Sequence, residues 1–233
     1  MGAIPKSSDV ALDGARRSLA LKLLPTLSQQ PRRAAEAIRA LRTHIVARHL
    51  ATGRRTLAVC AASANVGCTF VAANLAVALS QSGANTLLID ADLRDPKIHR
   101  IFPRTSPSEG LQQYLANPIS SISNLIEHDV LPKLSVLFAG GSAANPEELL
   151  ASSRFNDLMD FCLREFDATI IDTPPANSSS DVGRICSVAT YCAIVAARNR
   201  SFVNDVKLLA EQLRADGAFV VGAVLCESNG SLD

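Results

Sequence analysis

Short apolar runs alternate with longer amphipathic stretches from residue 56 to residue 226, and this alternation constrains the fold more than any other feature of the sequence. Helices are expected between most of the runs, notably over 69–82, 146–165 and 202–215. Because the runs are apolar at successive positions, they suit strands covered on both faces, as in a parallel sheet. The sequence therefore predicts an α/β fold with a mostly parallel sheet and helices on both faces. The predicted strands are Thr56–Ala61, Asn85–Asp90, Leu134–Ala139, Ala168–Asp172, Tyr191–Ala196 and Ala218–Cys226.

The first 50 residues divide into two parts. Prolines at positions 5, 25 and 31, with serine, aspartate and lysine between them, predict a mobile arm over residues 1–31. A helix is expected over residues 32–50, and residues 32–233 are expected to form one domain that includes it. The apolar stripe of this helix is predicted to contain Ala35, Ile38, Leu41, Ile45 and Val46.

Composition argues against several classes of partner and site. The net charge is +1 without a long single-sign run, so nothing in the charge pattern indicates nucleic acid. No apolar stretch reaches the roughly 18 to 20 residues that cross a bilayer, and the segment MGAIPKSSDVALDG lacks an apolar core of the secretory type. We therefore expect a cytoplasmic protein with no membrane span of its own. The six cysteines show no metal-ligand spacing, which favours free thiols over disulfides or zinc.

The segment ASANVGCTF, residues 62–70, lies between the first predicted strand and the next predicted helix. Small residues at positions 62, 63, 64 and 67 permit a phosphate to approach backbone N–H groups and the positive end of the helix dipole. Thr69 stands where the hydroxyl of a phosphate-binding loop ligates Mg²⁺. Cys68 occupies the position of the loop lysine, so the segment alone is also compatible with a plain strand–helix connection.

Acidic residues follow two further predicted strands. Asp90 and Asp92 are two positions apart, so in an extended segment both carboxylates project to one side, toward one metal ion or one attacking hydroxyl. Alone, this pair fits an aspartate-capped solvated turn equally well. Asp172 ends the run ATIID, where a P-loop fold places an acidic residue beside Mg²⁺. Because parallel strands end at the same edge of a sheet, the three segments together predict a P-loop nucleotide site.

Four blocks of the sequence carry a family pattern: GCTFVAANLAVALSQSG, LLIDADLRDPKIHRIF, AGGSAANPEELLAS and FDATIIDTPPANSSSD. They resemble the bacterial tyrosine kinases (BY-kinases), which belong to the P-loop NTPases with a deviant Walker A motif, as do the Min- and Par-type ATPases. The NPEELL and DTPP segments together distinguish this family from the partition ATPases. The resemblance implies ATP or ADP with Mg²⁺ as ligands. It also implies a membrane polysaccharide co-polymerase as the partner, in capsule or exopolysaccharide synthesis and export.

The resemblance also assigns roles to residues. It implies catalytic carboxylates at Asp90, Asp92 and Asp172, and Mg²⁺ ligands at Thr69, Asp90 and Asp172. The nucleotide-binding loop that it implies contains Ala64, Asn65, Val66, Gly67, Cys68, Thr69 and Phe70.

A fifth match, ExxRxxR, lies in the predicted N-terminal helix. Family members form rings through this pattern, which here consists of Glu36, Arg39 and Arg42. The spacing places the three residues on one side of a helix, where they offer a carboxylate and two guanidinium groups to a neighbouring subunit. The alternative is an exposed helix with an intrahelical Glu36–Arg39 pair.

The sequence departs from the family at three places, and all three concern catalysis. Cys68 replaces the lysine that neutralises charge on the transferring group, and Ser63 does not supply the second signature lysine of partition ATPases. Losing one such charge typically costs roughly 10²–10³ in rate. Cys226 stands where the family places an asparagine that binds adenine. The family's C-terminal tyrosine cluster has no counterpart, since the only tyrosines are Tyr114 and Tyr191.

The residues therefore favour a pseudokinase with weak or no phosphoryl transfer and with weakened or absent nucleotide binding. We expect a homo-oligomer, such as a ring, that reaches the inner membrane through its partner. The alternative is an active autokinase or ATPase that uses a compensating basic residue, Arg94 or Arg198, or one from a partner; a partition-type ATPase is less favoured. Cys68 at a helix N-terminus also suggests a reactive thiolate, the alternative being a small residue tolerated after the lysine was lost.

Overall fold

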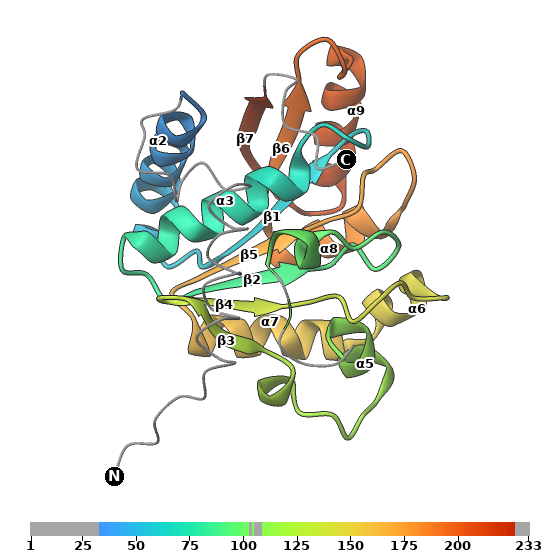
Figure 1. Cartoon of the computed structure of the whole chain (residues 1–233). Helices are drawn as coiled ribbons and strands as arrows, with labels where there is room; N and C mark the ends of the chain where they lie inside the picture. Colours follow the sequence, from blue (N-terminus) through green and yellow to red (C-terminus); the bar gives the residue numbers. More distant parts are fainter. Residues whose placement is uncertain (1–32, 103, 105–108, 227–233) are drawn as a thin grey trace.

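The computed structural model describes residues 33–102, 104 and 109–226. Its centre is a seven-stranded sheet with the strand order β3-β4-β2-β5-β1-β6-β7 (Figure 1). Neighbouring strands are parallel except β3 and β4, which are antiparallel. The strands are β1 (Thr56–Ala61), β2 (Thr86–Asp90), β3 (Glu127–Leu131), β4 (Leu134–Leu137), β5 (Ala168–Asp172), β6 (Tyr191–Ala197) and β7 (Phe219–Cys226).

Helices cover both faces of the sheet (Figure 1). Alternate side chains of β1 point to opposite faces: Leu57 and Val59 pack with α2, α3 and α4, whereas Ala58 and Cys60 pack with the later helices. The α-helices are α2 (Arg33–Arg48), α3 (Cys68–Gln81), α4 (Ile98–Ile101), α5 (Leu111–Ala116), α6 (Pro146–Ala151), α7 (Ser153–Glu165), α8 (Asp181–Ala189) and α9 (Val203–Ala215). Two 3₁₀ turns are η2 (Leu50–Thr52) and η3 (Ile122–Asn124).

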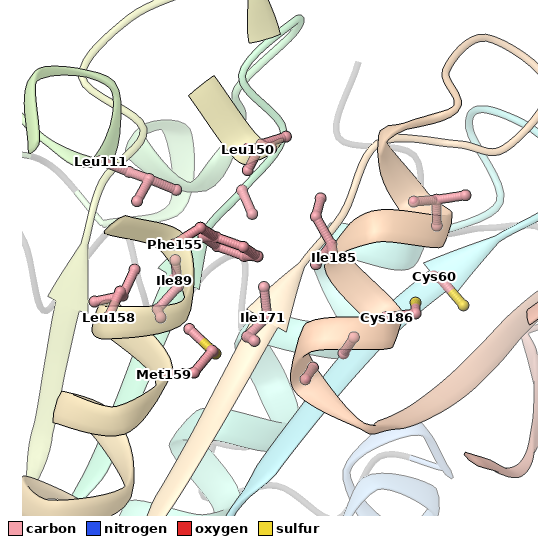
Figure 2. Packing of buried hydrophobic residues seen from close by; sticks show 14 of the residues in the cluster. Cys60, Ile89, Leu111, Leu150, Phe155, Leu158, Met159, Ile171, Ile185 and Cys186 are labelled. Atoms are coloured by element: carbon pink, nitrogen blue, oxygen red, sulfur yellow. The ribbon is translucent and has the colours of Figure 1, made fainter. Parts of the chain in front are cut away.

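The larger of the two apolar cores lies between the sheet and α7 and α8 (Figure 2). Phe155 of α7 and Ile185 of α8 are fully buried against Ile171 of β5. Cys60 and Cys186 belong to the same core, and with Cys192 they place three sulfur atoms within 4.8 Å of one another. All six cysteines are free thiols. This cluster is built from distant segments, so the sequence spacing did not reveal it.

The structure confirms the six predicted strands and the mostly parallel sheet. The antiparallel edge strand β3 was missed because its sequence, EHDVL, carries polar residues and is only partly buried. The single helix predicted over 146–165 is wrong: Ser152 is extended at φ −63° and ψ 154°, and it separates α6 from α7. Ala35, Ile38 and Ile45 are buried as predicted, but Val46 is exposed.

The predicted arm over residues 1–31 lies outside the described residues, as does the segment 227–233. Within the part of the chain that the structure describes, no helix is both long and apolar enough to cross a bilayer.

Candidate nucleotide site

Three segments meet at the carboxyl edge of the sheet. In the strand register, Asp90 at the end of β2 lies opposite Asp172 at the end of β5, and Asp172 lies opposite Val59 of β1. The loop 62–67 follows β1 and leads directly into α3. The pairing of β1, β5 and β2 as neighbours thus brings together the three segments from which the sequence predicted one site.

The loop adopts a tight conformation that depends on its backbone. Asn65 and Gly67 have φ values of 58° and 94°, in the left-handed region, and glycine has no Cβ to hinder that conformation. The segment after β5 binds the loop, because the backbone N–H groups of Ala176 and Asn177 donate to the carbonyls at positions 61 and 62, at 2.9 and 3.0 Å. Arg200 Nη1 also donates to the Asn65 carbonyl at 2.9 Å. The first turn of α3 leaves backbone N–H groups without helical partners at the end of this loop.

The side chain of Cys68 turns back toward β1. Its Sγ donates to the carbonyl of Val59 at 3.1 Å, and the hydroxyl of Thr173 donates to the same carbonyl at 3.1 Å. Burial, with a further contribution from the charge of Asp172, raises the pKa of this thiol well above its usual value. This direction argues against the predicted reactive thiolate, because a partly buried thiol beside a carboxylate favours its neutral form.

A cavity of about 260 Å³ opens at this edge. Of the predicted loop residues, Val66 is buried in the core and does not line the cavity. The lining residues are Ala61, Ser63, Ala64, Asn65, Gly67, Cys68, Thr69, Phe70, Asp92, Asp95, Lys97, Arg100, Thr173 and Pro175.

The three predicted catalytic carboxylates lie at this edge but differ in surroundings. Asp92 lines the cavity, and its Oδ1 accepts hydrogen bonds from the backbone of Arg94 and Asp95, at 3.2 and 3.0 Å. Asp90 is buried, and its Oδ2 accepts from the backbone N–H of Ile98 at 3.1 Å. Burial first, and then the charge of Asp172, raises the pKa of Asp90 well above its usual value.

Asp172 is fully buried, and within the described residues neither of its carboxylate oxygens has a hydrogen-bond partner. Burial raises its pKa to about 7, with a smaller contribution from Asp92, while the nearby Thr69, Cys68 and Lys97 act in the opposite direction. An unpartnered buried carboxylate costs free energy unless a cation compensates it. Together with the Thr69 hydroxyl, it forms a set of hard oxygen donors of the kind that Mg²⁺ prefers. The residues present therefore fit a Mg²⁺–nucleotide site.

The two arginines proposed to replace the loop lysine are placed differently. Arg94 Nε donates to Asp181 Oδ2 at 2.8 Å, and its Nη2 donates to Glu147 Oε1 at 3.2 Å. Arg198 is exposed and lies outside the set of residues that line the cavity. The basic side chains that do line it are Lys97 and Arg100, which the sequence analysis missed. The signal that could have found them is their position within ten residues of Asp90, in DLRDPKIHR.

Cys226 lies at the end of β7, close to the phosphate loop. A Cβ placed on Gly67 would lie 3.8 Å from its sulfur, which is ordinary contact.

On α2, Arg39 pairs with Glu36 at 2.9 Å, with side-chain exposures of 39% and 65%. Both partners of this pair are therefore accessible on the surface of α2, as the ExxRxxR prediction and its intrahelical alternative both require.

Comparison with known proteins gives the family. A family model described as "ParA: NUBPL iron-transfer P-loop NTPase" matches residues 53–224. CapB of Staphylococcus aureus, which carries the name of a tyrosine-protein kinase, is 32% identical over 190 residues that cover 82% of each chain. The chain belongs to the bacterial tyrosine kinases. A solved structure of the chimerical protein CapA2B2 agrees, with 31% identity and a TM-score of 0.80 over 89% of this chain and 90% of that one.

Other BY-kinases are much longer than this chain. The tyrosine-protein kinase Etk of Escherichia coli (strain K12) is 32% identical over 192 residues, which cover 82% of this chain but only 26% of Etk. The shared part is thus the P-loop domain, and this BY-kinase-family chain has that domain's fold with its mostly parallel sheet.

Proposed function

We propose that this protein is a pseudokinase subunit of a capsule or exopolysaccharide system, acting with a membrane polysaccharide co-polymerase. The observation that carries the proposal is the contrast within one loop. The left-handed backbone at Asn65 and Gly67 supports a phosphate cradle, whereas the Cys68 thiol, whose pKa is raised, is directed toward β1. The shape of the site is retained without the charge that phosphoryl transfer requires.

In this proposal the loop and the first turn of α3 receive the phosphates of ATP or ADP through backbone N–H groups. Thr69 and Asp172 would hold Mg²⁺, with Asp90 beside them, and Asp92 lines the cavity. When bound, Mg²⁺ would neutralise part of the charge of the phosphates. Without the loop lysine, the transition state loses on the order of 3 kcal/mol of stabilisation, so turnover becomes negligible while some affinity remains.

The proposal predicts that purified protein incubated with ATP and Mg²⁺ forms no phosphotyrosine. Cys68→Lys is expected to raise nucleotide affinity, because it restores a positive charge beside the loop. Cys68→Ser, which changes the same atom without adding charge, serves as the control and should not raise affinity. Autophosphorylation of the unmodified protein would refute the pseudokinase proposal.

The partner proposal rests on the named relatives. These place the chain among the BY-kinases, and the family resemblance implies pairing with the cytoplasmic tail of a membrane co-polymerase, which would hold this chain at the inner membrane. For self-association we propose the exposed Glu36 and the half-buried Arg39 and Arg42 of α2. An accessible pair such as Glu36–Arg39, worth less than about 1 kcal/mol, can exchange its partner for one on another subunit. Light scattering should then show a smaller oligomer for Arg39→Glu than for the matched change Arg48→Glu at the end of the same helix.

An active ATPase or autokinase is the second candidate, and it is favoured by the positive charges of Lys97 and Arg100 in the lining of the cavity. ATP hydrolysis measured with and without the co-polymerase tail discriminates between the two. A rate that rises with the tail would favour the active enzyme, whereas no hydrolysis in either case would favour the pseudokinase.

A further inference from the structure

The cavity beside the phosphate loop has a positive charge that comes from another strand end. Lys97 lines the same cavity as Asn65, Gly67 and Thr69, although it follows β2 rather than β1. Lys97 and Cys68, which stands at the position of the loop lysine, therefore line one cavity from two different strand ends. No motif of the sequence assigns a role to Lys97.

The backbone that carries Lys97 is fixed by the two aspartates of β2 and its following turn. Asp92 Oδ1 accepts from the N–H groups of residues 94 and 95, and Asp90 Oδ2 accepts from the N–H of Ile98, the residue after Lys97. Ile98 is itself fully buried. Lys97 is thus held on both sides in the chain by backbone hydrogen bonds that its own side chain does not make. Because the backbone is already ordered at this position, binding of a ligand to the Lys97 charge does not require a further loss of backbone entropy.

The Lys97 side chain is available for exchange. Its Nζ lies 2.9 Å from Asp95 Oδ2, and the two side chains are 25% and 65% exposed. An ion pair this open to water contributes less than about 1 kcal/mol, so a phosphate bearing two or more charges can displace the carboxylate. The flexible four-carbon stem of lysine suits this change of partner.

The other basic side chains are less suited to bind a phosphate in this cavity. Arg94 is held by the buried carboxylate of Asp181, which would be left unpaired if the arginine moved. Arg200 Nη1 donates to the backbone carbonyl of Asn65, and Arg200 is not among the residues that line the cavity. Arg100 also lines the cavity but is exposed, and it faces a second cavity as well. Among these basic residues, Lys97 both lines the cavity and has a half-buried side chain.

We propose that Lys97 replaces the missing loop lysine as the positive charge that binds the terminal phosphates of a nucleoside di- or triphosphate. The proposal deepens the pseudokinase function and rests on it: a lysine at position 97 restores ligand affinity, while the loop itself still lacks its charge for phosphoryl transfer. The ligand class is therefore a Mg²⁺-bound nucleoside polyphosphate, and the phosphotyrosine assay decides separately whether it is turned over.

Isothermal titration calorimetry with MgATP on the full chain tests the proposal. Lys97→Met is expected to weaken binding by about 10-fold to 100-fold, the usual worth of a charge-assisted contact to phosphate. Lys207→Met, which removes the same charge from the exposed face of α9, should change affinity by less than about twofold. Lys97→Arg keeps the charge and should retain most of the affinity, with thermal melting used to verify that each variant is folded.

The same substitution made in the Cys68→Lys variant tests whether Lys97 replaces the loop lysine. In Cys68→Lys, the loop has its own lysine, so adding Lys97→Met should cost less than about threefold in MgATP affinity. Equal losses in both backgrounds would overturn the proposal, as would a Lys97→Met affinity within about twofold of the parent, or a loss seen in Arg100→Met instead. Absence of MgATP binding by the parent would also overturn it. The pseudokinase proposal would survive that last result, because it is tested separately by phosphotyrosine formation and co-polymerase binding.

Discussion

Arg94 joins three segments that are far apart in the sequence. Its Nε donates to Asp181 Oδ2 at 2.8 Å and to Ser179 Oγ at 3.1 Å, and its Nη2 donates to Glu147 Oε1 at 3.2 Å. The Asp181 side chain is 2% exposed, whereas that of Arg94 is 36% exposed. Removing Arg94 would therefore leave a buried carboxylate without its charged partner.

The loss of stability expected on removing Arg94 follows from the exposed fractions of the Arg94 and Asp181 side chains. Removing one partner of a fully buried pair costs about 3 to 5 kcal/mol. Here water reaches the arginine, and Asp181 is the first residue of α8, where the helix dipole favours negative charge by about 0.5 to 1 kcal/mol. We therefore expect Arg94→Met to lower the free energy of unfolding by about 2 kcal/mol. In the double variant Arg94→Met/Asp181→Asn, the loss of unfolding free energy should be at least about 1 kcal/mol smaller than the sum of the losses in the two single variants.

Urea denaturation of the parent, both single variants and the double variant at constant salt measures the coupling between Arg94 and Asp181. The exposed Glu36–Arg39 pair on α2 is the matched control, and Glu36→Gln should cost less than about 0.5 kcal/mol. A coupling energy below about 0.5 kcal/mol, with unchanged slopes, would refute the view that Asp181 depends on this arginine.

Three further predictions concern the site and the core. Burial raises the pKa of Asp172 to about 7 in the folded protein, above its unfolded value near 4, so the stability it contributes at low pH is lost as pH rises through that interval. Urea denaturation without Mg²⁺ should then show that the free energy of unfolding of Asp172→Asn, relative to that of the parent, rises by about 2 to 3 kcal/mol between pH 5 and pH 8. A relative free energy of unfolding that stays constant over this range would contradict the raised pKa of Asp172. Cys68 should react with a thiol reagent more slowly in the folded protein than in urea, because burial raises its pKa; equal rates, followed by mass spectrometry, would count against this. Phe155→Ala should cost about 3 to 5 kcal/mol by thermal or urea unfolding, against less than about 1 for the exposed Leu163→Ala on the same helix.

The parallel core of the fold could be predicted because its strands are continuous apolar runs, whose burial depends little on tertiary detail. The edge strand β3 could not, because its partly polar sequence becomes a strand only by pairing with β4. The break at Ser152 was missed for a similar reason: no proline or glycine marks it, and the residue is extended in the folded chain.

For the site, the sequence placed Thr69, Asp90, Asp92 and Asp172 near one edge because each follows or ends a predicted strand. It did not reveal that Asp90 and Asp92 hydrogen-bond to the backbone of the turn that carries Lys97. Such bonds depend on the path of the chain after β2, and spacing alone does not determine that path. The partner of Arg94 was likewise hidden, since Asp181 lies 87 residues away.

The Cys68 thiol donates to a main-chain carbonyl inside the sheet, and the left-handed residues and backbone bonds that shape the loop involve other positions. The fold therefore depends little on the identity of residue 68. In the proposed pseudokinase, a single substitution can return the charge to a loop that has kept its conformation, so the proposed loss of catalysis would be reversible for as long as the scaffold is needed.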